Sequence, residues 1–143
     1  MIKKKKILIV IGDYYSVITN SLLDSAKKTL IKPFKLRVIT VPGVFEIPVI
    51  ISKNIKKFDA FIALGCVIKG ETPHFDFISK ASIEAIMNLS VDNKKPIANG
   101  IITCLNMKQA IARKNNKGEE AANAINSFFD ILELDNKDTL VDF

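Results

Sequence analysis

The chain has 143 residues, of which 48% are hydrophobic and 25% are charged. This balance excludes an intrinsically disordered chain, and the length fits one domain with a substantial hydrophobic core. No apolar run is long enough to span a bilayer, and the short run after the first lysines lacks the features of a signal peptide. We therefore expect a cytoplasmic protein without a membrane partner.

The formal net charge of +6 overstates the basic character of the chain, because Lys3 to Lys6 supply four positive charges. A solvated basic tip is the expected meaning, and no basic stripe with interleaved aromatics predicts a nucleic-acid partner. The only arginines are Arg37 and Arg113. One explanation for an arginine among so many lysines is that its planar guanidinium binds carboxylate or phosphate through two hydrogen bonds. Chance is the other explanation, and two residues do not decide between them.

The two cysteines, Cys66 and Cys104, have neither CxxC spacing nor the spacing of a metal site. We expect free thiols and no bound metal.

Short apolar runs alternate with helical patterns along the chain. Strands rich in isoleucine and valine are predicted at residues 7–11, 36–41, 60–64 and 97–103. Helices are predicted at residues 17–30, 45–55, 74–89, 107–113 and 118–132, with a short connection between the last two. Right-handed β-α-β units follow from this alternation. They predict a single α/β domain over residues 1–143, with three α/β/α layers and a four-stranded parallel, flavodoxin-like sheet.

Ligands of such sheets bind beyond the carboxyl ends of the strands. This rule selects the loops at residues 12–15, 42–46, 65–74 and 103–106. The first two loops place Tyr14 and Phe45 next to polar groups, which suits a flat heterocycle with a polar substituent. For each aromatic alone, a place in the core is the favoured interpretation, and Glu46 alone is compatible with a role at a helix dipole. Their position at one edge of the sheet favours a site.

The loop after the third strand contains the only histidine, His74. Gly65 and Gly70 are expected to free the backbone to turn, with Thr72 as the N-cap and Pro73 as the first residue of a helix. A helix start of this kind favours a phosphate, and the imidazole beside it suits proton transfer. The alternative is an ordinary loop with an exposed histidine.

A family resemblance is carried by three segments, VPGVFEIP (41–48), ALGCVIKGETPHFD (63–76) and NKGEEAA (116–122). They resemble signature blocks of the 6,7-dimethyl-8-ribityllumazine synthase family, and the similarity extends from about Ile7 to Leu132. The resemblance implies a transferase of riboflavin biosynthesis that needs no cofactor or metal. Its reaction would condense 5-amino-6-ribitylaminouracil with 3,4-dihydroxy-2-butanone 4-phosphate to 6,7-dimethyl-8-ribityllumazine, releasing phosphate and water.

The same resemblance implies the roles of individual residues. His74 would transfer protons, and Glu120 would support the site. The pyrimidine and its ribityl chain would contact Tyr14, Val44, Phe45, Glu46, Cys66, Val67, Ile68, Asn99 and Lys117. The butanone phosphate would contact Glu71, Thr72 and Arg113.

Self-association is also implied, as a ring of five with each site between neighbouring copies. Arg113 and Lys117 are expected to come from the neighbour, because a connection between two helices should not lie beside the strand ends of its own chain. Whether such rings form a hollow icosahedral capsid is left open. The resemblance also suggests riboflavin synthase as a partner.

The chain departs from the family pattern in several places, one of which is Asn99, where the family usually has a bulkier apolar residue. Its first loop reads Gly12-Asp13-Tyr14-Tyr15, where the family commonly has Arg-Phe-Asn or Arg-Trp-Asn, and the segment from Arg113 to Gly118 is several residues shorter.

Two alternative functions remain. One is a lumazine- or flavin-binding module without turnover. The other is a phosphorylated receiver domain, which would need an acidic cluster that Asp13 and Asp59 do not supply.

Overall fold

The computed structural model describes residues 4–137 and 140–142. Its strands are β1 (Lys6–Gly12), β2 (Lys35–Val41), β3 (Ala60–Ile68) and β4 (Ile97–Cys104). Its helices are α1 (Ser16–Thr29), α2 (Ile47–Asn54), α3 (His74–Asn93) and α4 (Met107–Lys137), and a 3-10 turn, η1 (Val44–Glu46), precedes α2.

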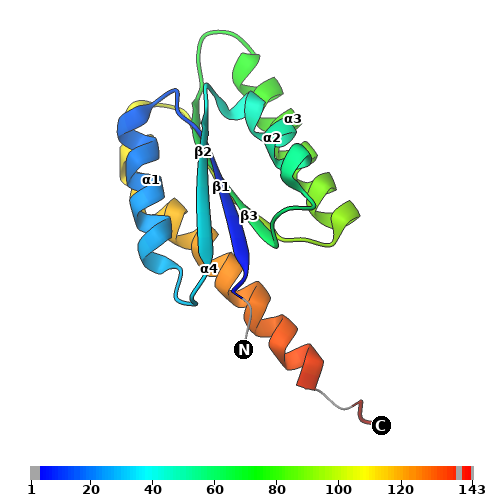
Figure 1. Cartoon of the computed structure of the whole chain (residues 1–143). Helices are drawn as coiled ribbons and strands as arrows, with labels where there is room; N and C mark the ends of the chain where they lie inside the picture. Colours follow the sequence, from blue (N-terminus) through cyan, green and yellow to red (C-terminus); the bar gives the residue numbers. More distant parts are fainter. Residues whose placement is uncertain (1–3, 138–139, 143) are drawn as a thin grey trace.

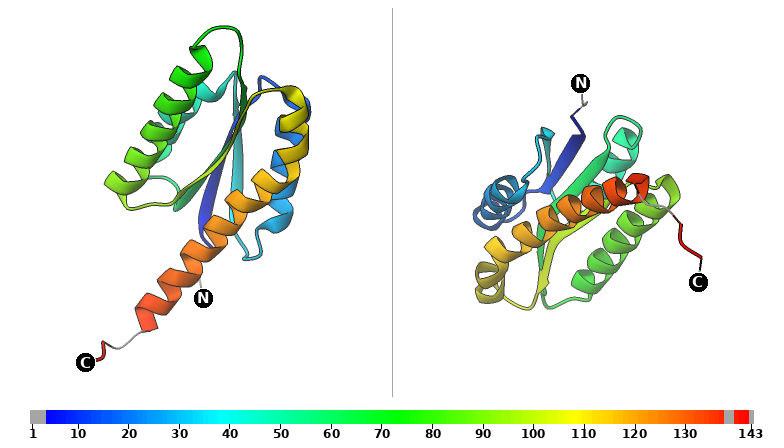
Figure 2. Two further views of the ribbon diagram at one scale, coloured as in Figure 1. Left: turned by 180° about the vertical axis from the view of Figure 1, so that it is seen from behind. Right: turned by 90° about the horizontal axis from the view of Figure 1, so that it is seen from below.

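The four strands form one parallel sheet in the order β2-β1-β3-β4. Helices α1 and α4 cover one face of the sheet, and α2 and α3 cover the other (Figures 1 and 2). This arrangement confirms the predicted three-layer α/β/α fold with a four-stranded parallel sheet.

The central strand β1 supplies both halves of the core because successive side chains point to opposite faces of a sheet. Ile7, Ile9 and Ile11 pack in the cluster that contains buried residues of α1 and α4. Leu8 and Val10 pack in the cluster of α2 and α3. All five are nearly or fully inaccessible to solvent, which is why this strand reads as an uninterrupted apolar run.

The prediction that the chain turns at Gly65 is wrong. Strand β3 continues to Ile68, which pairs with Cys104 of β4, and no glycine in the described residues has a positive φ. A Cβ atom on Gly65 would instead collide with the Val44 side chain. The glycine therefore allows close packing of the strand against η1.

The two last predicted helices form the single helix α4, so the expected connection between Arg113 and Gly118 does not exist. A glycine inside a helix costs about 1 kcal/mol relative to alanine. Here a Cβ atom on Gly118 would collide with the backbone of Leu22. The glycine marks the close crossing of α4 over α1, and sequence periodicity alone could not distinguish this crossing from a helix boundary.

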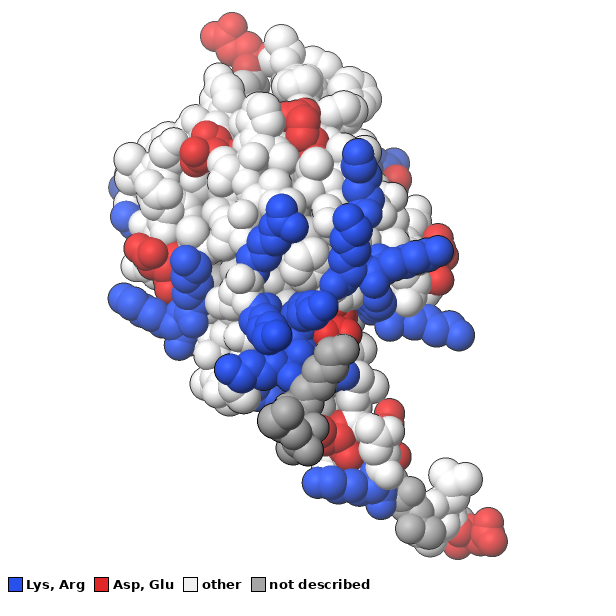
Figure 3. All heavy atoms as spheres, viewed as in Figure 1, with Lys and Arg blue, Asp and Glu red and all other residues white. Residues whose placement is uncertain are grey.

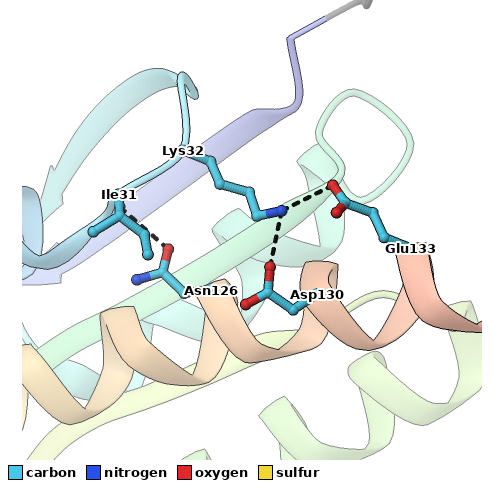
Figure 4. Close-up of polar contacts among 5 residues, drawn as sticks. All are labelled: Ile31, Lys32, Asn126, Asp130 and Glu133. Atoms are coloured by element: carbon cyan, nitrogen blue, oxygen red, sulfur yellow. Dashed lines mark hydrogen bonds and ion pairs between the residues drawn. The ribbon is translucent and has the colours of Figure 1, made fainter.

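Polar contacts anchor the second half of α4 to the end of α1 and to the segment that follows it (Figure 4). The Asn126 amide donates to the Thr29 carbonyl at 2.9 Å and accepts from the Ile31 N–H at 3.3 Å. The Lys32 ammonium lies 2.9 Å from Asp130 and 2.8 Å from Glu133. Beyond these contacts, α4 projects past the end of the sheet (Figure 1).

The helices within the described residues all lack the combination of length and hydropathy that a membrane span requires.

Candidate active site

A cleft of about 740 Å³, here called the first cleft, opens at the carboxyl ends of the central strands. It is formed by the loops after β1 and β2, by the last residues of β3 and by the first two turns of α3. The residues that line it are Tyr14, Tyr15, Gly43, Val44, Phe45, Glu46, Cys66, Val67, Ile68, His74, Phe77, Ile78 and Ala81. Its position is the one that the topology of a parallel sheet favours for a ligand.

Backbone contacts hold the loops of the first cleft together. The Asp13 N–H donates to the Val41 carbonyl at 2.9 Å, which joins the loops after β1 and β2. The Glu46 N–H donates to the Gly43 carbonyl at 3.2 Å and closes the turn that precedes α2. The walls of the cleft are therefore built on the rigid ends of the sheet.

Three aromatic rings of the first cleft are exposed to solvent. Tyr14 is 75% exposed, Phe45 63% and Phe77 69%. Exposed large apolar groups gathered around a hollow mark a binding surface, and flat rings favour stacking on a flat ligand.

Tyr15 differs from Tyr14 because its ring packs against the core below α1. The two rings meet edge to face with centroids 4.8 Å apart. Burial, followed by the neighbouring Tyr14, raises the pKa of the Tyr15 phenol. Tyr15 is therefore a neutral support for the more exposed Tyr14 ring.

The Cys66 thiol lines the first cleft but is not a reactive thiolate. Burial, followed by the neighbouring Cys104, raises its pKa to about 12. Both cysteines are free and buried. Since the thiolate is the nucleophilic form, Cys66 serves as an apolar wall.

His74 is the first residue of α3 and lines the first cleft. Pro73 occupies the N-cap position, so the predicted cap at Thr72 is displaced by one residue. The Thr72 hydroxyl instead accepts a long hydrogen bond of 3.4 Å from the His74 N–H. Thr72 and Glu71 are exposed in the loop just before the helix and do not line the cleft.

A second cleft of about 280 Å³ lies between β4 and α4. Arg113, Lys117 and Glu120 line it together with Ile101, Ile102, Thr103 and Asn116. The Arg113 guanidinium donates to the Thr103 carbonyl at 3.3 Å, and the Lys117 ammonium lies 3.9 Å from the Glu120 carboxylate. The first and second clefts share no lining residue.

Asn99 lies on the edge strand β4, outside both clefts. Its side-chain oxygen accepts a hydrogen bond of 3.0 Å from the Ile101 N–H. The single chain therefore brings most of the predicted pyrimidine-binding residues together, but it leaves Asn99 and Lys117 apart from them.

Tyr15 and Phe77 line the first cleft but were not predicted from the sequence. Phe77 lies three positions after His74 on α3, a spacing that places two side chains on the same helix face. This spacing could have identified Phe77. Tyr15 could not be separated from Tyr14 without knowing where α1 begins.

Within residues 4–137 and 140–142, no group of three or more His, Cys, Asp or Glu side chains has an arrangement that could hold a metal ion.

The fold and the first cleft define a small α/β protein with an aromatic-lined cleft at the carboxyl edge of a parallel sheet. Residues 4–133 match the family model described as 6,7-dimethyl-8-ribityllumazine synthase. The chain belongs to this family, as its sequence blocks predicted.

Several proteins named 6,7-dimethyl-8-ribityllumazine synthase are similar to the chain. The one from Bartonella henselae is 44% identical over 131 residues, covering 85% of this chain and 84% of the relative. The one from Buchnera aphidicola subsp. Baizongia pistaciae is 42% identical over 143 residues, covering 92% and 89%. The one from Vesicomyosocius okutanii is 40% identical over 139 residues, covering 87% and 83%.

Proposed function

We propose that this chain is an enzyme that condenses 5-amino-6-ribitylaminouracil with 3,4-dihydroxy-2-butanone 4-phosphate to 6,7-dimethyl-8-ribityllumazine. The observation that carries the proposal is the position of the family's sequence blocks. Segments 41–48 and 63–76 both contribute to the first cleft, which also contains the only histidine. Family membership supports the same reaction, and it does not favour a binding module without turnover.

In the proposed complex the pyrimidine occupies the first cleft. Tyr14 and Phe45 offer exposed rings for stacking. Glu46 is half-buried beside them and can accept hydrogen bonds from the ribityl hydroxyls. The wall formed by Cys66, Val67 and Ile68 completes the contact with the ring.

In the proposed mechanism, His74 moves protons at the reacting atoms. The amine of the pyrimidine attacks the ketone and forms an imine with loss of one water, phosphate leaves by elimination, and ring closure releases a second water. Each of these steps transfers a proton, and a positioned imidazole accelerates such transfers. The rest of the catalytic effect comes from holding the two substrates together.

The phosphate of the second substrate needs a cation that the first cleft does not supply. Within the part of the chain that the structure describes, no lysine or arginine lines the first cleft. Arg113 and Lys117 lie in the second cleft. We infer that a neighbouring copy presents its second cleft to the first cleft, so that Arg113 meets the phosphate near Glu71 and Thr72.

Exposed apolar side chains on α3 support this association. Phe77, Ile83, Met87 and Val91 are between 36% and 69% exposed, and their spacing places them along one side of the helix. Such a line of apolar groups is typical of a surface covered by a partner. Three statements about assembly and partners stay predictions: a ring of five, a capsid built from such rings, and riboflavin synthase as a partner.

The proposed reaction takes place in the cytoplasm. Cys66 and Cys104 are free although they are near neighbours, which fits a compartment that keeps thiols reduced.

Mixing two inactive variants tests both the reaction and the shared site. His74→Asn removes one half of the site and Arg113→Ala the other. If neighbours share sites in a ring, subunit exchange at equal amounts restores up to about one quarter of the sites, because each restored site needs an intact residue from each of two copies.

The readout is the absorbance of lumazine formed from both substrates. A wild-type chain without lumazine formation would contradict the proposed reaction. Mixed variants that exchange subunits, shown by mass spectrometry, and yet stay inactive would contradict the shared site alone.

A further inference from the structure

The first loop carries Asp13 where the family commonly has a basic residue, and the structure shows what this carboxylate contacts. The Thr19 hydroxyl donates to Asp13 Oδ1 at 2.6 Å. Thr19 is fully buried in the first turns of α1, and Asp13 is half-buried. A short hydrogen bond to a carboxylate is among the stronger polar contacts in proteins.

Asp13 is anchored twice, because its own N–H also donates to the Val41 carbonyl at 2.9 Å. Tyr15, on the other side of Tyr14, is anchored by its carbonyl, which accepts from the Ile18 and Thr19 N–H groups at 3.0 Å each. Tyr14 therefore lies between two fixed residues, while its ring stays 75% exposed.

The N-terminus of α1 has no side-chain cap of the usual kind. Its N-cap residue is Tyr15, which forms no side-chain hydrogen bond to the helix. The hydrogen bond between Asp13 and Thr19 instead connects the segment before α1 to the helix. It also places a negative charge near the helix N-terminus, where the dipole favours it.

We propose that Asp13 and Thr19 are positioning residues that hold the Tyr14 ring, supported edge-on by Tyr15, in the orientation that stacks on the pyrimidine. Neither residue lines the first cleft, so both act through Tyr14. Fixing a ring before the ligand arrives removes the entropic cost of ordering it on binding. The inference rests on the proposed function for the identity of the ligand.

The test uses Thr19→Val, which removes the hydroxyl at nearly constant volume, and Thr19→Ser, which keeps the hydroxyl. Asp13→Asn keeps an acceptor oxygen without the charge. Ser21→Ala is the matched control, because the Ser21 hydroxyl bonds only to the Val17 carbonyl of the same helix at 3.3 Å. Thermal unfolding of each variant establishes that it is folded.

We expect Thr19→Val to raise KM for the pyrimidine, and Kd for 6,7-dimethyl-8-ribityllumazine, about tenfold, as for loss of one hydrogen bond to a charged group. KM for the butanone phosphate should stay unchanged. Asp13→Asn should show a smaller rise, and Thr19→Ser and Ser21→Ala should behave like the wild type.

A merely structural role predicts a lower unfolding temperature with unchanged pyrimidine KM and lumazine Kd, and that result would overturn the proposal. Equal changes for both substrates would overturn it as well. If Thr19→Val fails to fold, Asp13→Asn decides by the same measurements. A wild-type protein without turnover would contradict the proposed function, while the lumazine Kd would still decide the role of this contact.

Discussion

The first cleft is lined mainly by aromatic and aliphatic side chains together with His74 and Glu46, whereas the second cleft contains Arg113, Lys117 and Glu120. The first is assembled from the ends of three strands. The second lies between one edge strand and one long helix. A planar heterocycle suits the first cleft, and a phosphate suits the cations of the second. Under the proposed function, each chain carries two halves of a site that it does not itself join.

The largest effect is expected at His74, which we propose to be the proton-transfer residue of the first cleft. We expect His74→Asn to lower kcat by about two to four orders of magnitude, the usual contribution of general acid–base catalysis. Steady-state kinetics of lumazine formation would measure it, with Glu84→Gln, an exposed change further along α3, as the control. Full activity of His74→Asn would remove the assignment.

The second cleft should respond to a change that keeps its charge. Arg113→Lys loses the planar fork that binds phosphate through two hydrogen bonds. We expect KM for the butanone phosphate to rise about 10- to 100-fold, as for loss of a hydrogen bond between charged groups. KM for the pyrimidine should stay constant.

Arg37→Lys is the matched control, since Arg37 is exposed on β2 and lines neither cleft. An increase confined to the pyrimidine KM of Arg113→Lys would mean that the second cleft serves the other substrate.

Gly118→Ala tests whether the close crossing of α1 and α4 supports the second cleft. The new methyl group collides with the Leu22 backbone, and overpacking of this kind costs about 1–3 kcal/mol of the free energy of unfolding. Denaturant unfolding should show this loss, and lumazine binding at the first cleft should change less than the butanone phosphate KM. Gly70→Ala is the control, because open space surrounds that position. Equal stability of both variants would contradict the close crossing.

The smallest expected effect concerns one ring of the first cleft. Tyr14→Leu keeps an apolar side chain but loses aromatic stacking, which is worth about 0.5–1.5 kcal/mol. Kd for 6,7-dimethyl-8-ribityllumazine, measured by fluorescence titration, should rise about two- to tenfold. Val17→Ala, which removes an exposed apolar group outside the cleft, should leave Kd unchanged. Unaltered affinity of Tyr14→Leu would show that Tyr14 does not stack on the ring.

The fold class could be predicted from the amino-acid sequence, because buried parallel strands and amphipathic helices impose different periodicities on the chain. The sequence also selected the first cleft, since Tyr14, Phe45 and His74 each follow a strand of a parallel sheet and the ends of such strands meet at one edge.

The roles of the glycines and of the last helix depend on tertiary contacts that the sequence pattern does not report. Gly65 and Gly118 were interpreted as a turn and a helix boundary, but each lacks a side chain because another segment packs against it. The contact between Asp13 and Thr19 is equally invisible in the sequence. Local sequence pattern reports backbone preference and hydrophobicity, whereas these features depend on which distant segments lie within van der Waals or hydrogen-bonding distance.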